Sequence, residues 1–153
     1  MPRTDSASQV VNADVQRVFT ALLDPEQLRK WLPPQGMTGR FEHFDARPGG
    51  SYRLVLTYDD RTSAAGKATP DSDIVEARFV EIVPDSRVVQ AVEFVSDDPA
   101  FAGTMTMTWE VAARRDGTEV TIRATDVPAG ITPEDHAVGL ATSLAQLAAF
   151  IEP

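Results

Sequence analysis

The stretch Thr132–Glu152, TPEDHAVGLATSLAQLAAFIE, predicts one long amphipathic helix and offers the largest apolar surface in the chain. Thr132 suits the N-cap position, and Pro133 suits the first helical position. Glu134 and Asp135 place negative charge in the first turn, where the helix dipole favours it. Apolar residues then recur at spacings of three and four, which indicates one buried stripe. This stripe consists of Ala137, Leu140, Ala141, Leu144, Leu147, Ala148 and Ile151.

The chain before this helix consists mainly of segments with the alternation or apolar content of β-strands. Residues 104–113 alternate most clearly, because Met105, Met107 and Trp109 fall on one side and threonines fall on the other. That pattern is typical of an antiparallel strand with one solvated face. The strands that we expect cover residues 6–11, 38–44, 51–58, 74–83, 87–95, 104–113 and 118–125, and two short helices cover residues 14–23 and 24–32.

Short turns join the successive strands and predict an antiparallel meander. Pro48–Gly50 has the composition of a turn, and Asp116-Gly117 is a strong hairpin signal. We therefore expect an α+β fold, in which a curved antiparallel sheet of about six or seven strands wraps around the long C-terminal helix. Two short helices follow the first strand. The polar stretch Asp59–Asp73 is expected to form a mobile loop.

Length and composition limit the possible classes of protein. The 153 residues are expected to form a single domain, 1–153, with room for a sizeable core. The formal charge of −9 argues against nucleic acid and anionic membranes as partners, and the absence of cysteine excludes disulfides. No apolar run approaches the ~20 residues of a membrane span. Met1–Asp5 lacks the apolar core of a signal peptide, so a cytoplasmic location is expected.

The two histidines are the candidates for acid–base chemistry. His43 lies on an expected strand between acidic neighbours and could face a bound ligand, although we favour a structural or surface position for it. Strand alternation places His43 with Phe41 and opposite Phe44, so its direction stays open. His136 lies in the first helical turn beside two carboxylates, where we favour a solvent-exposed neutral ring. The two histidines do not have the spacing of a metal site, and no metal or cofactor is expected.

Several aromatic and methionine side chains could line a cavity instead of filling a core. Met105, Met107 and Trp109 share one strand face, and methionine adapts to irregular shapes. Plain hydrophobic core is the alternative interpretation of this face. Tyr52, Tyr58 and Trp31 could supply hydrogen-bonding groups at a cavity mouth, or they could cap the core.

Short motifs in a fixed order resemble those of START-like (SRPBCC) domains, and within them the group named after the activator of the heat-shock-protein-90 ATPase. The motifs are Ala13 to Phe19, Asp24-Pro25-Glu26 with Trp31, Arg47-Pro48-Gly49-Gly50, Pro84-Asp85-Ser86-Arg87-Val88, Gly117-Thr118-Glu119-Val120-Thr121, and Gly139, Ser143, Leu144 and Leu147. The resemblance covers nearly the whole chain. It implies a helix-grip fold with a cavity between sheet and helix.

One position departs from the group's pattern. The group usually has Gly-Trp in the final helix, whereas this chain has Gly139-Leu140. Leucine removes an aromatic wall, so the resemblance implies a larger or differently shaped pocket here.

We therefore favour a protein that binds an apolar small molecule, lipidic, aromatic or polyketide-like, over an enzyme. The alternatives are an enzyme of the cyclase or hydratase type in the same cavity, and a chaperone-interaction module, as the group's name suggests. The expected cavity residues are Trp31, His43, Tyr52, Leu54, Leu56, Phe79, Met105, Met107, Trp109, Leu140 and Leu144. The resemblance also makes a homodimer plausible, because lone domains of this group often pair.

Overall fold

The computed structural model describes residues 3–34, 36–58 and 72–152. In these ranges the chain forms one β-sheet and three α-helices. The elements are β1 (Thr4–Val11), α1 (Val15–Leu23), α2 (Pro25–Trp31), β2 (Met37–Phe44), β3 (Ser51–Tyr58), β4 (Ser72–Val83), β5 (Arg87–Phe94), the 3-10 turn η2 (Pro99–Phe101), β6 (Met105–Arg114), β7 (Gly117–Thr125) and α3 (Pro133–Ile151).

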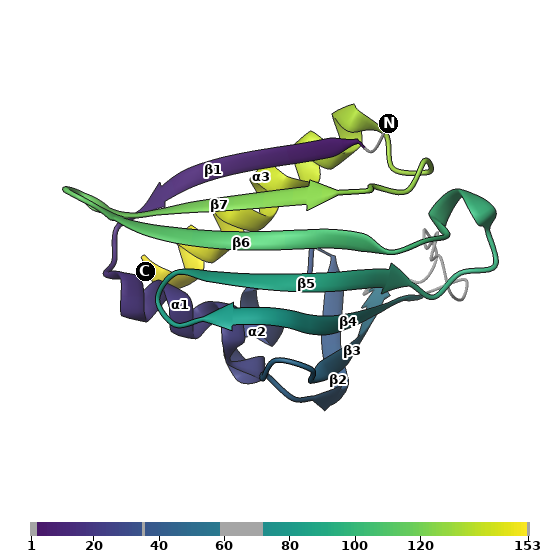
Figure 1. Cartoon of the computed structure of the whole chain (residues 1–153), viewed down its shortest axis with the longest axis horizontal. Coiled ribbons are helices and arrows are strands. Elements are labelled where there is room, and N and C mark those ends of the chain that lie inside the picture. The colour runs from purple at the N-terminus through teal and green to yellow at the C-terminus, as the bar shows by residue number, and fades with distance from the viewer. Residues whose placement is uncertain (1–2, 35, 59–71, 153) are drawn as a thin grey trace.

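The strands form one antiparallel sheet of seven strands in the order β1-β7-β6-β5-β4-β3-β2. Strands β2 to β7 follow one another as a meander, and β1 completes the sheet by pairing with β7. Helix α3 crosses behind β1, β7 and β6 on one face of the curved sheet, as Figure 1 shows. The predicted α+β helix-grip architecture is confirmed, including the two short helices after the first strand.

Side-chain caps start the helices where the sequence places them. Asp14 accepts a hydrogen bond from the Arg17 amide at 2.8 Å, and Asp24 accepts one from the Glu26 amide at 2.9 Å. Thr132 caps α3 by accepting from the Asp135 amide at 3.1 Å. Each cap satisfies an amide that has no partner within its helix, which fixes the first residue of the helix. None of the helices in the described ranges is both long and apolar enough to cross a membrane.

The buried stripe of α3 differs from the predicted one in its N-terminal half. Leu140, Leu144, Leu147, Ala148 and Ile151 are buried as predicted, but the predicted members Ala137 and Ala141 are exposed. His136 and Ser143 are partly buried in their place. The apolar spacing did not reveal this difference, because the inward positions one turn before and one turn after Gly139–Leu140 carry the polar side chains of His136 and Ser143.

The end of α2 is fastened between α1 and α3. Trp31 is 2% exposed, which confirms its predicted burial, and its indole Nε1 donates to the Ala21 carbonyl at 2.9 Å. The Gln146 amide of α3 donates to the carbonyls of Trp31 at 2.7 Å and Pro33 at 3.1 Å. These bonds hold the Trp31 ring against the sheet face that α3 covers.

The mobile loop predicted for Asp59–Asp73 lies mostly outside the described residues, which resume at position 72. The last residues of that stretch belong to β4 instead of a loop. Asp73 is only 6% exposed, so β4 begins with a buried carboxyl group.

Candidate functional site

A cavity of about 370 Å³ lies between the inner face of the sheet and the N-terminal half of α3. Most of its wall is apolar. Of the residues predicted to line it, the cavity wall contains Trp31, Tyr52, Leu54, Leu56, Met105, Met107, Trp109 and Leu140. Leu22, Leu28, Leu32, Pro34, Met37, Val75, Val92, Phe94 and Ile122 add further apolar surface.

Two predicted cavity residues are packed core instead. Phe79 and Leu144 are each 1% exposed and do not border the cavity. Phe79 contacts the rings of Phe44 and Tyr52, with centroid distances of 5.8 and 5.9 Å. Leu144 lies one helical turn beyond Leu140, and the cavity ends between these two positions.

Aromatic rings from three elements form part of the cavity wall. Trp31 of α2 and Trp109 of β6 meet edge to face, with ring centroids 5.7 Å apart and planes inclined at 79°. Tyr52 reaches the same wall from β3. Both tryptophans of the chain therefore border the cavity.

Two buried polar side chains interrupt this apolar wall without bonding to the protein. Gln90 of β5 is 7% exposed and Tyr52 is 6% exposed. Neither side chain hydrogen-bonds to another residue in the described part of the chain. Buried polar groups normally have partners, so both groups have hydrogen-bonding capacity available to a molecule in the cavity.

A histidine also borders the cavity, contrary to the solvent-exposed position expected for His136. Its side chain is 11% exposed, and its Nδ1 lies 2.7 Å from Oδ2 of Asp5. Arg3 holds the same carboxyl group at 3.0 Å and donates to the Ile131 carbonyl at 2.6 Å. Strand β1 and the first turn of α3 thus fix the imidazole ring against the cavity.

The Asp5 carboxyl group is ionised at neutral pH. Burial alone would raise its pKa, but hydrogen bonds from His136 and Arg3 outweigh that effect, and the pKa of Asp5 falls below its usual value. An ionised carboxylate only accepts hydrogen bonds, so Nδ1 of His136 must be the donor. Asp5 therefore fixes which ring nitrogen carries the proton.

Sequence reasoning missed the Asp5–His136 pair because the predicted first strand began at Ser6. Strand β1 begins at Thr4, and alternation then puts Asp5 on the inner face with Ala7. A carboxylate at an inward strand position needs a partner, and Asp5 could have indicated a buried polar pair for this reason. The partner is 131 positions away in the sequence, so the sequence could not identify it.

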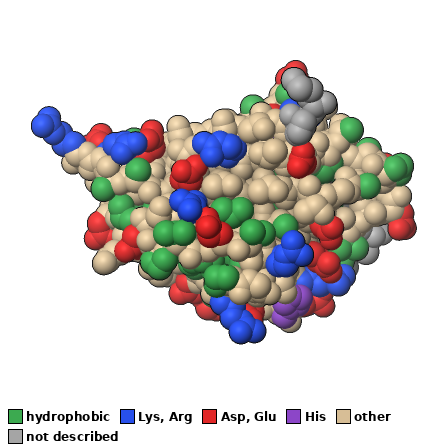
Figure 2. Space-filling view, viewed as in Figure 1, with side chains coloured by type: hydrophobic (Ala, Val, Ile, Leu, Met, Phe, Trp, Pro, Cys, Tyr) green, Lys and Arg blue, Asp and Glu red, His purple; other side chains and the backbone are tan. Residues whose placement is uncertain are grey.

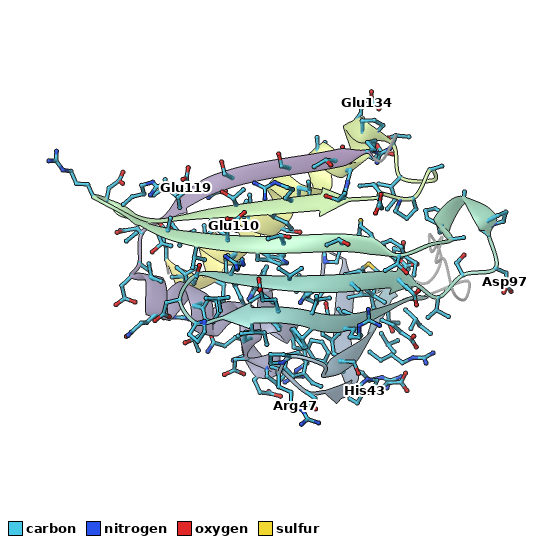
Figure 3. The ribbon with its side chains drawn as sticks, viewed as in Figure 1. His43, Arg47, Asp97, Glu110, Glu119 and Glu134 are labelled. Carbon is cyan, nitrogen blue, oxygen red and sulfur yellow. The ribbon has the colours of Figure 1, made fainter. Side chains whose placement is uncertain are left out.

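His43 lies on the opposite face of the sheet, outside the cavity, which corrects its predicted cavity-lining position. A register shift between Phe41 and His43 interrupts the alternation of β2. Phe41 and Phe44 consequently share the inner face, with centroids 4.9 Å apart. His43 is exposed, and its Nε2 lies 3.1 Å from the Ser51 hydroxyl. Figure 3 shows it at the β2 end of the sheet, away from α3.

The outer face of the sheet carries paired charges. Arg53 contacts Glu42 at 3.0 Å and Glu76 at 2.9 Å, and Arg123 contacts Glu110 at 2.8 Å. Figure 2 shows acidic and basic side chains interspersed on this face. Among the described residues, no group of three or more His, Cys, Asp or Glu side chains is arranged to hold a metal ion. The inner cavity is therefore the candidate functional site.

Tyr52 is expected to keep its proton until high pH, because burial raises its pKa to about 12. The unfolded chain loses this proton near pH ~10, so stability falls as the pH rises from about 10 to about 12, by about 3 kcal/mol in total. Below pH ~10 both states are protonated, and Tyr52 adds no pH dependence. The phenolate absorbance of a Tyr58→Phe variant reports Tyr52 alone, since the chain has two tyrosines. Ionisation near pH ~10 in the folded variant would contradict the burial of Tyr52.

The sheet, its covering helix and the cavity between them define a START-like (SRPBCC) domain of the helix-grip type. More particularly, the chain belongs to the family described as activator of Hsp90 ATPase homolog 1-like protein, whose model matches residues 12–152. This confirms the family resemblance of the sequence motifs.

Solved structures include close and distant likenesses. Protein CV1439 from Chromobacterium violaceum is 33% identical, with a TM-score of 0.85, over 98% of this chain and 97% of that one. A protein from Rhizobium leguminosarum is 21% identical, with a TM-score of 0.73, over 99% and 95%. DynU16, from the dynemicin biosynthetic locus, is 18% identical, with a TM-score of 0.72, over 97% of this chain and 47% of that one. The last two show likeness of fold alone. A search of curated proteins found no match.

Proposed function

We propose that this protein binds a small apolar molecule, lipidic, aromatic or polyketide-like, in the cavity between the sheet and α3. The observation that carries the proposal is an apolar-walled space of about 370 Å³ between the sheet and α3. Protein interiors are close-packed, with few voids larger than a water molecule. A space of this size lies in the range of ligand sites, roughly 300–1,000 Å³.

A second candidate function is an enzyme of the cyclase or hydratase type that uses the same cavity. Such chemistry needs at least two polar groups beside the bound molecule. Tyr52, Gln90 and His136 all border the cavity, and Asp5 orients His136. An enzyme of this type would also have to bind the apolar molecule in the cavity.

The chaperone-interaction alternative has no comparable support. Such a module would present a contiguous apolar surface patch. The large exposed hydrophobic side chains among the described residues are Val10, Val80 and Val138, which lie on β1, β4 and α3. Single exposed hydrophobic residues on three separate elements do not form such a patch.

Occupancy of the cavity can be tested with N-phenylnaphthylamine, a neutral probe that fluoresces in apolar surroundings. We expect the wild type to bind it, with a change in tryptophan emission because both tryptophans border the cavity. Gly139→Leu should weaken binding about five- to tenfold, because Gly139 borders the cavity and an added side chain narrows it. A Cβ at Gly139 meets no atom within 4 Å, so the helix should accept it.

Ala141→Leu is the matched control, since Ala141 lies on the same helix, is exposed and does not border the cavity. Its probe affinity should equal that of the wild type. Equal probe affinity in all three proteins, or no uptake by the wild type, would contradict the proposal. Native mass spectrometry of protein purified from its own host would then identify the bound molecule directly.

A further inference from the structure

One histidine at the cavity has its neutral tautomer set by the fold. Asp5 accepts from Nδ1 of His136 at 2.7 Å, so Nδ1 carries the proton. In a neutral imidazole the other nitrogen, Nε2, is then an acceptor with a free lone pair. The neutral ring therefore presents an acceptor here, in the way that a carboxylate orients a catalytic or metal-binding histidine.

Nε2 of His136 has no hydrogen-bond partner among residues 3–34, 36–58 and 72–152. The imidazole borders the cavity, and its side chain is 11% exposed. A second polar group, the Gln90 amide, is 7% exposed, borders the same cavity and is equally unpartnered in these ranges. Two polar side chains without partners, on opposite walls of an apolar cavity, indicate a bound molecule that carries polar atoms.

The charges around the cavity disfavour an anionic ligand. The carboxyl group of Asp73 lies in the cavity wall, and that of Asp5 lies directly behind His136. No lysine or arginine of the described chain lines the cavity. Arg3 is already engaged by Asp5 and by the Ile131 carbonyl. A carboxylate such as a fatty acid would be desolvated here, and the described part of the cavity wall offers it no cation.

We propose that the cavity selects a neutral aromatic molecule bearing a hydroxyl group, a phenol or an enol, whose O–H donates to Nε2 of His136. This inference rests on the proposed binding function and narrows its ligand class. The rings of Trp31, Trp109 and Tyr52 provide flat surfaces for an aromatic skeleton. The Gln90 amide, which can donate and accept, serves a second polar atom of the ligand.

Three ligands with the same ring skeleton test the hydroxyl donor and the neutral charge separately. They are β-naphthol, its methyl ether and β-naphthoate. The methyl ether keeps the rings but has no O–H to donate, and the naphthoate is an anion. By calorimetry we expect β-naphthol to bind the wild type about tenfold tighter than the ether, a difference of about 1.4 kcal/mol. The naphthoate should bind more weakly than β-naphthol.

His136→Phe should reduce the naphthol-to-ether affinity ratio to about one while the ether still binds, because the Nε2 acceptor is lost. His43→Phe is the matched control, since the other histidine lies on the outer face. It should keep the wild-type ratio. The ligand comparison on the wild type remains decisive even where His136→Phe does not fold.

NMR of isotope-labelled histidine in His43→Gln observes the His136 ring alone, because the chain has two histidines. We expect the Nδ1–H tautomer, and an Nε2 signal that shifts with β-naphthol but not with its ether. Equal affinities for naphthol and ether, tighter binding of naphthoate, or a ring protonated at Nε2 would overturn the inference while the binding function stands. Failure of all three ligands and of the neutral probe would overturn both.

Discussion

Leu144→Ala is expected to lower the free energy of unfolding by about 3–5 kcal/mol, whereas Leu140→Ala should cost only about 1–2 kcal/mol. The two leucines are one turn apart on α3 and almost equally buried, at 1% and 3% exposed. Leu144 is surrounded by packed core, so its truncation leaves a new hole. Leu140 already borders the cavity, so its truncation enlarges an existing space and breaks fewer contacts.

Chemical denaturation of both variants measures the difference directly. The pair is internally controlled, because the substitution, the helix and the burial of the side chain are matched. Equal losses of about 3–5 kcal/mol would mean that the wall around Leu140 is as tightly packed as the core around Leu144, contrary to the cavity seen here.

Leu140→Trp is expected to leave the protein folded and to weaken binding of N-phenylnaphthylamine about 100-fold. The indole is expected to fill part of the cavity, so several carbon groups of the probe can no longer be buried there. Each buried carbon group contributes about 0.8 kcal/mol to the binding free energy. It also restores the Gly-Trp pair that is usual in the family's final helix. Probe emission is the suitable readout, because the substitution adds a further tryptophan to the protein.

The unfolding midpoint of Leu140→Trp shows whether the added indole occupies an open cavity or is forced into a packed core. Insertion into a filled core typically costs about 1–3 kcal/mol, whereas a side chain that fits an open space costs little. Marked destabilisation together with unchanged probe binding would contradict the assignment of Leu140 to the cavity wall. Leu144→Trp, directed into packed core, should be strongly destabilised and serves as the contrasting variant.

Local patterns were enough to predict most of the fold. The alternation in β6, the caps at Asp14, Asp24 and Thr132, and the Asp116-Gly117 turn each act within a few residues of chain. Such effects depend on nearby backbone geometry, so the sequence displays them directly. The aromatic and methionine part of the cavity wall followed from the same alternation, because residues two apart on a strand share one face.

The polar part of the cavity could not be predicted in this way. A one-residue register shift in β2 puts His43 on the outer face while Phe41 and Phe44 share the inner face, and such bulges have no firm sequence signature. Gln90 sits between inward valines on β5 as a lone polar residue. Its sequence neighbours give no sign that the wall it joins encloses a space.

The sequence by itself therefore determined the class of fold, the order of its elements and the apolar faces that must meet. Only the tertiary structure decided that these faces leave about 370 Å³ between them, because a void depends on how side chains from several elements fit together. It also decided the role of His136. Nothing in the local helix sequence favours an inward direction for a histidine in its first turn. The inward direction is stabilised by the Asp5 carboxylate of β1, whose Oδ2 lies 2.7 Å from Nδ1 of the ring.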